Sequence, residues 1–358
     1  MALTHVRIVG SGLIGTSIGL ALVAKGVTVT MVDIDDKAAS LAQDLMGESS
    51  HIPTDNGNPE ITVIASPISS ISQVIRYEIQ QGFNLGFIDI SSVKVNPVLE
   101  VQSTGLEMDR FLPSHPMAGR EVGGAESARA DLFQGRPWAI DPAGVYEPLL
   151  AAGRELIELC GGNILEIPAS EHDRAVALVS HLPQIMSSLL AAQLEGAPAE
   201  WLDLSGSGLR DTTRIAASSP TLWREIIAAN SQALIPLIDR LIESLRDLNR
   251  SLATDPSSEG AVEEFIKAGN RGRAMIPGKH GGVARNYTHL PVVIEDKPGQ
   301  LAALFDECAS AQVNVEDLSI EHSPEQYTGL ITLSLSQSDA EKLYHHLLER
   351  GWRAHAPR

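Results

Sequence analysis

The segment Ser114–Glu121, SHPMAGRE, places a histidine directly before a proline. A residue in that position is biased away from helical geometry, so His115 should lie at a strand end or in a loop. Its imidazole can exchange a proton near neutral pH, because the ordinary pKa of histidine is about 6.5. His115 is therefore a candidate general base. The alternative is a loop histidine that only bonds to the backbone.

Arginines give a second chemical signal. The formal net charge of −18 argues against nucleic-acid binding, and it would also repel an anionic small substrate. Such a substrate must be bound by a few locally placed cations. If 208–218 is helical, Arg210 and Arg214 lie four residues apart on one face, with Asp211 between them in the sequence. This face is a candidate anion site, and the alternative is a pair of solvated arginines.

Three glycines form a candidate nucleotide-binding turn. Gly10, Gly12 and Gly15 follow an apolar run and open a helical pattern. They allow a tight turn, close approach of a pyrophosphate and close packing of the helix, respectively. Asp33, roughly twenty residues on, can accept hydrogen bonds from a ribose diol and would repel a 2′-phosphate, so NAD is favoured. The predicted cofactor contacts are Gly10, Ser11, Gly12, Leu13, Ile14, Gly15, Asp33, Ser66 and Pro67.

The elements that must position these residues alternate short apolar runs with helical patterns. Such strands, separated by helices, indicate a parallel sheet covered on both faces, an α/β Rossmann-type fold. The predicted strands are 6–10, 27–33, 61–66, 85–90, 109–114, 136–141 and 164–168.

The pattern changes twice further along the chain. We predict a Rossmann domain over 1–168, an all-α substrate and dimerisation domain over 169–275, and a linker rich in glycine and basic residues over 276–287. Residues 288–358 follow the order strand, helix, strand, strand, helix, strand, which is the ferredoxin-like βαββαβ order.

Several motifs, taken in order, resemble those of the prephenate dehydrogenase family. They are GSGLIG at 10–15, SSVK at 91–94, SHPMAGRE at 114–121, EHDRAVALVSHLPQ at 171–184 and RDTTRIAASSPTLWREI at 210–226. The last part of the chain, with DKPGQL at 296–301, resembles an ACT domain. The resemblance implies oxidative decarboxylation of prephenate to 4-hydroxyphenylpyruvate with NAD, in tyrosine biosynthesis.

The family resemblance also implies residue roles. His115 would accept the proton of the ring hydroxyl, Ser92 would bind that hydroxyl and hold the imidazole, and Arg214 would bind the ring carboxylate. His181 would be the second active-site histidine. Trp223 would lie near the substrate side chain, with a core tryptophan as the alternative.

Lys94 and His172 lie in the same motifs, but we assign neither of them to the active site. Lys94 is interpreted as a solvated or phosphate-side charge. His172 and His181 are nine residues apart, which puts them on opposite faces of a continuous helix, so we do not expect both in one pocket. We expect Pro183 to kink this helix, and His172 to lie at its start.

Arg120 and Glu121 are expected to line the pocket for the substrate side chain. A cation at Arg120 would repel the ammonium group of arogenate and favour the keto-carboxylate of prephenate. The adjacent Glu121 would oppose this, by attracting the ammonium group or by pairing with Arg120. Arogenate dehydrogenase is therefore the alternative function.

The C-terminal resemblance implies a regulatory site between paired copies, with tyrosine as the effector; a module that only dimerises is the alternative. The expected effector residues are Asp296, Pro298, Gly299, Gln300, Leu301, Asn314 and Val315. We expect a homodimer.

Other classes are less compatible with the sequence. Only two cysteines occur, Cys160 and Cys308, which fits a reducing cytoplasm and gives no metal site. No long apolar run or cleavable leader is evident, so neither membrane insertion nor secretion is expected. A β-hydroxyacid-type dehydrogenase would need a lysine, and 171–190 has none. A non-catalytic amino-acid sensor remains the remote alternative.

Overall fold

The computed structural model describes residues 3–47, 59–83, 86–119, 123–254, 259–276, 287–322 and 328–358. By contact density the chain divides into two compact units, Met1–Leu245 and Arg246–Arg358. The boundary between the units falls within a single long helix, Ser231–Thr254.

Seven strands form the sheet of the first unit, in the spatial order β2-β1-β3-β4-β5-β6-β7. All seven predicted strands are present: β1 His5–Val9, β2 Thr28–Val32, β3 Ile61–Ile64, β4 Phe87–Asp89, β5 Phe111–Pro116, β6 Pro137–Ile140 and β7 Asn163–Glu166. The first five strands in chain order are parallel, as expected, but β6 pairs with β5 in antiparallel register and β7 runs parallel to β6. The prediction of a fully parallel sheet is therefore wrong for the last two strands.

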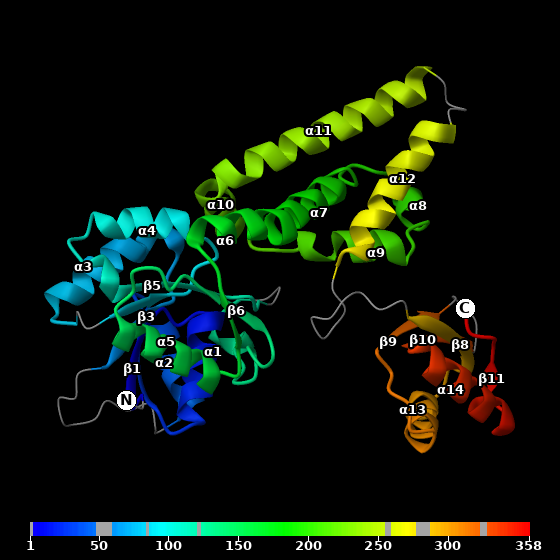
Figure 1. Cartoon of the computed structure of the whole chain (residues 1–358), viewed down its shortest axis with the longest axis horizontal. Helices are drawn as coiled ribbons and strands as arrows, with labels where there is room; N and C mark the ends of the chain where they lie inside the picture. Colours follow the sequence, from blue (N-terminus) through cyan, green and yellow to red (C-terminus); the bar gives the residue numbers. More distant parts are fainter. Residues whose placement is uncertain are drawn as a thin grey trace. The chain divides into compact units, whose positions relative to one another are not determined.

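Helices cover both faces of this sheet (Figure 1). On one face, apolar side chains from α1 (Leu13–Val23), α2 (Asp36–Met46) and α5 (Glu147–Leu159) pack on the strands. On the other face, α3 (Ile71–Gln80) and α4 (Val95–Gln102) pack together over Phe87 and Phe111. Strands that are apolar on both sides are therefore buried on both faces of the sheet. This packing fixes the positions of their carboxyl ends.

A helical segment follows β7, as predicted. It contains α6 (Ala169–Val176), a π-helical turn over Ala177–His181, α7 (Leu182–Ala192), α8 (Ala199–Leu202) and α9 (Ser207–Thr213). A 3₁₀ turn over Arg214–Ala216, helices α10 (Pro220–Ala229) and α11 (Ser231–Thr254), and α12 (Glu259–Ala274) complete it.

The stretch Ala169–Ala192 is long and apolar enough to cross a membrane, by length and composition only. We did not expect such a stretch from the sequence. It carries His172, Asp173 and His181, whose side chains are buried within the protein and hydrogen-bonded there. Those polar side chains are therefore bonded within the protein, while only 28% of the apolar window is buried among the described residues.

The C-terminal part has the predicted order of elements. They are β8 (Thr288–Glu295), α13 (Gln300–Ser310), β9 (Asp317–His322), β10 (Thr328–Leu335), α14 (Gln337–Glu349) and β11 (Arg353–Ala354). The strands form an antiparallel sheet in the order β11-β8-β10-β9. One face packs on α13 and α14 through a core that includes Leu290, Leu304 and Leu333.

Candidate active site

The glycine turn has the geometry that a dinucleotide requires. Gly10 follows β1 with φ of +114°, a conformation that side chains rarely adopt, and a Cβ there would lie 2.4 Å from the Ala65 carbonyl oxygen. A Cβ on Gly15 would lie 2.0 Å from the Gly10 oxygen, so α1 can approach the turn only because this residue is glycine. A Cβ added to Gly12, by contrast, would have no atom of the described residues within 4 Å, which leaves the Gly12 backbone open. A phosphate can therefore approach the start of α1.

Asp33 is held at the end of β2 by the turn itself. Its Oδ2 accepts hydrogen bonds from the backbone N–H of Ser11 (2.7 Å) and from the Ser11 hydroxyl (2.8 Å), and its Oδ1 accepts one from the Asp35 N–H (3.0 Å). Burial raises the pKa of the Asp33 carboxyl, but these hydrogen bonds outweigh it and the pKa is lowered. The carboxylate is thus ionised and oriented, as ribose recognition by NAD requires.

The remaining predicted cofactor contacts lie beside this turn. Leu13 and Ile14 are in the first turn of α1, and Ser66 and Pro67 follow β3. The Ser66 hydroxyl accepts a hydrogen bond from Ser70 at 3.0 Å. The residues therefore line the carboxyl ends of adjacent parallel strands, where doubly wound sheets bind nucleotides.

His115 lies near the carboxyl end of β5, as its position before a proline predicted. Its Nδ1 is 2.9 Å from Nε2 of His172 on α6, and the two rings meet edge to face. The pKa of His115 lies well below its ordinary value, first because the ring is desolvated and then because the charge of Lys94, and any proton taken up by His172 or His181, disfavours a further positive charge there. His115 is therefore neutral at neutral pH and available as a proton acceptor.

Asp173 links His172 to the start of α4. Its Oδ1 lies 2.8 Å from His172 Nδ1 and also accepts the backbone N–H of Lys94 at 2.8 Å, while its Oδ2 accepts that of Val95 at 2.9 Å. His172 and Asp173 are 3% and 4% exposed, so water does not compete for these bonds. The carboxylate thus caps α4 and holds His172, the partner of His115, at the same time.

Lys94 is buried beneath the site rather than solvated, and our interpretation of it was wrong. Its ammonium forms an ion pair with the buried Asp89 and donates a hydrogen bond to the Ser114 carbonyl oxygen at 2.5 Å. Burial lowers the pKa of Lys94, whereas Asp89 and Asp173 oppose that shift. Because it bonds to the residue before His115, Lys94 fixes the backbone that carries the base.

His181 belongs to the same cluster. Its Nδ1 lies 3.0 Å from Nδ2 of Asn230, which also donates to the Asp173 carbonyl oxygen at 2.8 Å. Burial lowers the pKa of His181 to about 4, and a nearby Asp173 only partly offsets this. The ring of Trp223 meets that of His181 at a centroid distance of 5.9 Å. Trp223 is also half-buried against Ile226, so it is both a core residue and a neighbour of the site.

The π-helical turn explains why our expectation about the two histidines was wrong. Nine residues of regular α-helix turn through about 900°, which leaves the ends on opposite faces. A π-helical turn accommodates roughly one extra residue, which rotates the later part back by about 100°. The turn at Ala177–His181 therefore brings His172 and His181 to the same region, around His115.

The predicted substrate arginines lie on a segment that packs against α7. Gln184 of α7 donates to the Ile215 carbonyl oxygen at 2.9 Å, which ties the 3₁₀ turn after α9 to that helix. Arg210, Asp211 and Arg214 are exposed there. Because α9 ends at Thr213, the helix expected over 208–218 is interrupted before Arg214.

Two further predictions have different outcomes. Ser92 is half-buried, and within the described residues its hydroxyl makes no hydrogen bond to His115; His172 makes the contact with the imidazole that was expected of Ser92. Arg120 and Glu121 lie outside the described residues.

Four features of the site were not predicted from the sequence: Asp173, Asn230, the burial of Lys94 and the contact of His172. Asp173 lies 79 residues from Lys94 in the chain, and Asn230 lies 57 residues from Asp173. The local spacing of residues therefore could not predict these hydrogen bonds. The available signal was weaker: polar side chains within otherwise apolar helical stretches, which need partners when buried.

The predicted effector residues lie at two opposite ends of the C-terminal sheet. The segment Asp296–Leu301 follows Glu295, which pairs with Thr328, whereas Asn314 and Val315 precede Asp317, which pairs with Ser334. At about 3.3 Å per residue, the length of β8 separates the two groups by about 23 Å. One copy of the sheet therefore cannot bring them together.

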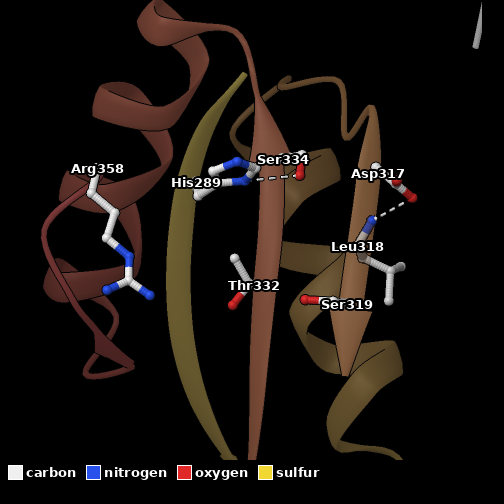
Figure 2. A pocket seen from close by; sticks show the side chains of 7 residues that line it. All are labelled: His289, Asp317, Leu318, Ser319, Thr332, Ser334 and Arg358. Carbon is white, nitrogen blue, oxygen red and sulfur yellow. Dashed lines mark hydrogen bonds between the residues drawn. The ribbon is translucent and has the colours of Figure 1, made fainter. Parts of the chain in front are cut away.

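A separate cavity of about 340 Å³ lies on this sheet (Figure 2). It is lined by His289, Asp317, Leu318, Ser319, Thr332, Ser334 and Arg358, and His289 Nδ1 lies 3.1 Å from the Ser334 hydroxyl. None of its lining residues is among the predicted effector residues. Among the residues that the structure describes, no group of three or more His, Cys, Asp or Glu side chains is arranged to hold a metal ion.

The glycine turn after β1, the oriented aspartate at the end of β2 and the histidine near the carboxyl end of β5 are the arrangement expected of a dinucleotide-dependent dehydrogenase. Comparison with known proteins is more specific. Residues 18–166 match the prephenate dehydrogenase nucleotide-binding domain, and residues 168–268 match the prephenate dehydrogenase dimerization domain. The chain belongs to the prephenate dehydrogenase family, and its cofactor is NAD.

Individual relatives of the chain have names that agree with this family. A protein of Streptomyces niveus named probable prephenate dehydrogenase NovF is 33% identical over 98% of this chain and 99% of its own length. The cyclohexadienyl dehydrogenase of Zymomonas mobilis is 29% identical over 77% of this chain and 97% of its own. The crystal structure of prephenate dehydrogenase from A. aeolicus, in complex with hydroxyphenyl propionate and NAD+, has 25% identity and a TM-score of 0.68, covering 77% of this chain and 99% of that one.

Proposed function

We propose that this protein catalyses the NAD-dependent oxidative decarboxylation of prephenate to 4-hydroxyphenylpyruvate. The observation that carries the proposal is His115, a neutral imidazole near the carboxyl end of β5, in the sheet whose first strand leads into the glycine turn. The names of the relatives support the substrate class.

His115 and the two arginines have separate roles in this reaction. NAD, when bound, accepts the hydride from the ring carbon that bears the hydroxyl. His115 takes the proton of that hydroxyl, which contributes about 10²–10⁴-fold when the base is well placed. Arg214 binds the ring carboxylate until it leaves as carbon dioxide, since a guanidinium matches the geometry of a carboxylate. Arg210 lies one helical turn earlier and adds positive charge at the same segment.

Ser92 is assigned to the substrate hydroxyl, because it is half-buried two residues before Lys94 and its own hydroxyl makes no hydrogen bond to any residue that the structure describes. His181 and Trp223 border the substrate side chain. Asp211, which lies between the two arginines in the sequence, is assigned with them to substrate binding.

Prephenate is proposed over arogenate because of Arg120. A cation at that position attracts the keto-carboxylate of prephenate and repels the ammonium group of arogenate, and Glu121 acts in the opposite sense. Arogenate dehydrogenase is the second candidate, since the same base and arginine would serve it.

The experiment is prephenate-dependent formation of NADH by the purified full-length chain, measured beside arogenate and beside the His115→Asn variant. We expect a higher kcat/KM for prephenate than for arogenate, and little turnover by the variant. A preference for arogenate would select the second candidate. Equal turnover by a folded His115→Asn protein would contradict both.

The C-terminal part is proposed to be an ACT domain that binds tyrosine. Its element order and sheet order support this, as does Gly299, whose φ of +89° makes the turn before α13. The residues assigned to tyrosine are Asp296, Pro298, Gly299, Gln300, Leu301, Asn314 and Val315.

The same proposal covers the organisation of the protein. The division into 1–168, 169–275, 276–287 and 288–358 is retained, with a homodimer formed through the helical part and a place in the cytoplasm. The match of 168–268 to a dimerization domain supports the dimer.

A further inference from the structure

The hydrogen bonds behind His115 can be assigned from the backbone outward. Asp173 accepts the backbone N–H groups of Lys94 and Val95, one on each carboxylate oxygen. A backbone N–H can only donate, so both oxygens act as acceptors. The group is 4% exposed and keeps these partners without competition from solvent.

This arrangement determines the proton positions on both histidines. His172 Nδ1 lies 2.8 Å from an oxygen that only accepts, so Nδ1 carries a proton. In the neutral ring the other nitrogen, Nε2, then has a lone pair and accepts. Nε2 is 2.9 Å from His115 Nδ1, which therefore donates and must be protonated. The remaining nitrogen of His115, Nε2, is left without a proton.

We propose that His172 and Asp173 are positioning residues that hold His115 in the one neutral tautomer whose Nε2 can accept a proton. The inference rests on the function proposed above, in which the reaction removes a proton from a ring hydroxyl. The substrate O–H bond breaks, its proton moves to His115 Nε2, and its electron pair forms the C=O bond as the hydride leaves for NAD. The resulting imidazolium is stabilised through its Nδ1–H bond to His172.

His181 is held in the opposite tautomer by the same principle. Asn230 Nδ2 donates to the Asp173 carbonyl oxygen, which fixes the orientation of the amide, and its second hydrogen points to His181 Nδ1. His181 Nδ1 is therefore an acceptor, and the proton of the neutral ring lies on Nε2. The site thus holds one imidazole that accepts a proton and one that donates a hydrogen bond.

Two substitutions at His172 separate this role from packing. In His172→Gln the amide oxygen can still accept the hydrogen bond from His115 Nδ1, whereas His172→Leu fills similar space without an acceptor. We expect the glutamine variant to keep kcat within about tenfold of wild type and the leucine variant to lose about 10²–10⁴-fold. KM for prephenate and the dissociation constant for NAD should change little in both. A leucine variant as active as the glutamine variant overturns the proposal.

Asp173→Asn tests the source of the orientation. An amide must present a donor either toward the Val95 N–H, or toward both the Lys94 N–H and His172, and in the second orientation the tautomers of both histidines reverse. In that second orientation we expect a loss of kcat comparable to that of His172→Leu, and the first orientation, which keeps the tautomers, should keep kcat. Glu171→Gln, on the exposed side of the same helix and paired there with Arg174, is the matched control and should keep full activity. Wild-type kcat in an Asp173→Asn protein whose ¹⁵N signals show reversed histidine tautomers refutes the relay.

A readout that does not need turnover distinguishes this inference from the proposed function. In the full chain with ¹⁵N-labelled histidine, the His115 signals are those missing from the His115→Asn variant. We expect Nδ1 to be protonated and Nε2 not, above the pKa of the ring. The reverse pattern overturns the tautomer assignment even if prephenate is turned over, and the expected pattern stands even if another substrate is found.

Discussion

At the scale of single residues, burial first and the charge of Lys94 second lower the pKa of His115. Lys94 also bonds to the carbonyl oxygen of Ser114, the residue before His115. A base with a lowered pKa is a weaker acceptor but is fully deprotonated at neutral pH. The cluster therefore makes His115 a weaker base but keeps it in the deprotonated form that can accept a proton.

The pH dependence of kcat/KM should show this directly. Below its pKa His115 is protonated and cannot act, and because burial and neighbouring charge lower that pKa, activity should persist below pH 6.5 and fall only in more acidic buffer. The measurement is a pH profile of kcat/KM with prephenate. An acidic midpoint at or above pH 6.5 would show that the imidazole is not shifted as the structure indicates.

A pair of glycine variants separates cofactor binding from folding. Gly12→Ala places its methyl group in open space, so the free energy of unfolding should stay within about 1 kcal/mol of wild type while NAD binds more weakly. Gly15→Ala forces a methyl group against the Gly10 oxygen and Ala65, so it should destabilise the fold by about 1–3 kcal/mol. NAD titration and denaturant unfolding of both variants provide the check. Equal stability of the two would contradict the packing described for α1.

At the scale of elements, the π-helical turn at Ala177–His181 is the feature that assembles the site. Much of the fold was predictable from the sequence: the seven strand positions, the glycine turn and the strand-end placement of His115 follow from local patterns. The site was not fully predictable, because the extra residue in one helical turn changes which side chains share a face. A spacing argument based on 3.6 residues per turn gives the wrong answer for His172 and His181.

Deletion of Val179 tests the role of this turn. The side chain is 65% exposed, so its removal costs little packing, but a regular α-helix would rotate α7 by about 100° relative to α6. We expect helix content by circular dichroism to be preserved and kcat to fall by more than about 100-fold, because misplaced catalytic groups lose most of their effect. Val179→Ala, which keeps the residue count, should remain active. An active deletion variant would show that the turn is incidental.

At the scale of the whole molecule, the two predicted effector segments lie at opposite ends of one sheet, so the proposed tyrosine site can include both only if two chains contribute to it. If Asp296 of one copy and Asn314 of another complete the site, Asp296→Ala and Asn314→Ala should each abolish the effect of L-tyrosine on activity or Tm. Asp306→Ala, an exposed acidic residue of α13, should not.

Mixing the two inactive variants gives the decisive result. In a mixed dimer one site receives both substitutions and the other receives neither, so we expect part of the tyrosine response to return after the chains are unfolded and refolded together. No recovery in verified mixed dimers would place the effector within a single copy. Absence of any tyrosine effect in the wild-type chain would remove the regulatory role altogether.

Asp173 both caps α4 and orients His172, and these two roles determine when in folding the protein can become active. The carboxylate that closes the start of α4 is the one that orients His172, and it comes from a part of the chain made after the entire sheet. A nascent chain that ends at 168 already holds every glycine of the turn and could bind NAD, yet its His115 has no fixed proton. The chain therefore becomes catalytically active only after the later helices have packed, although it can bind its cofactor before that.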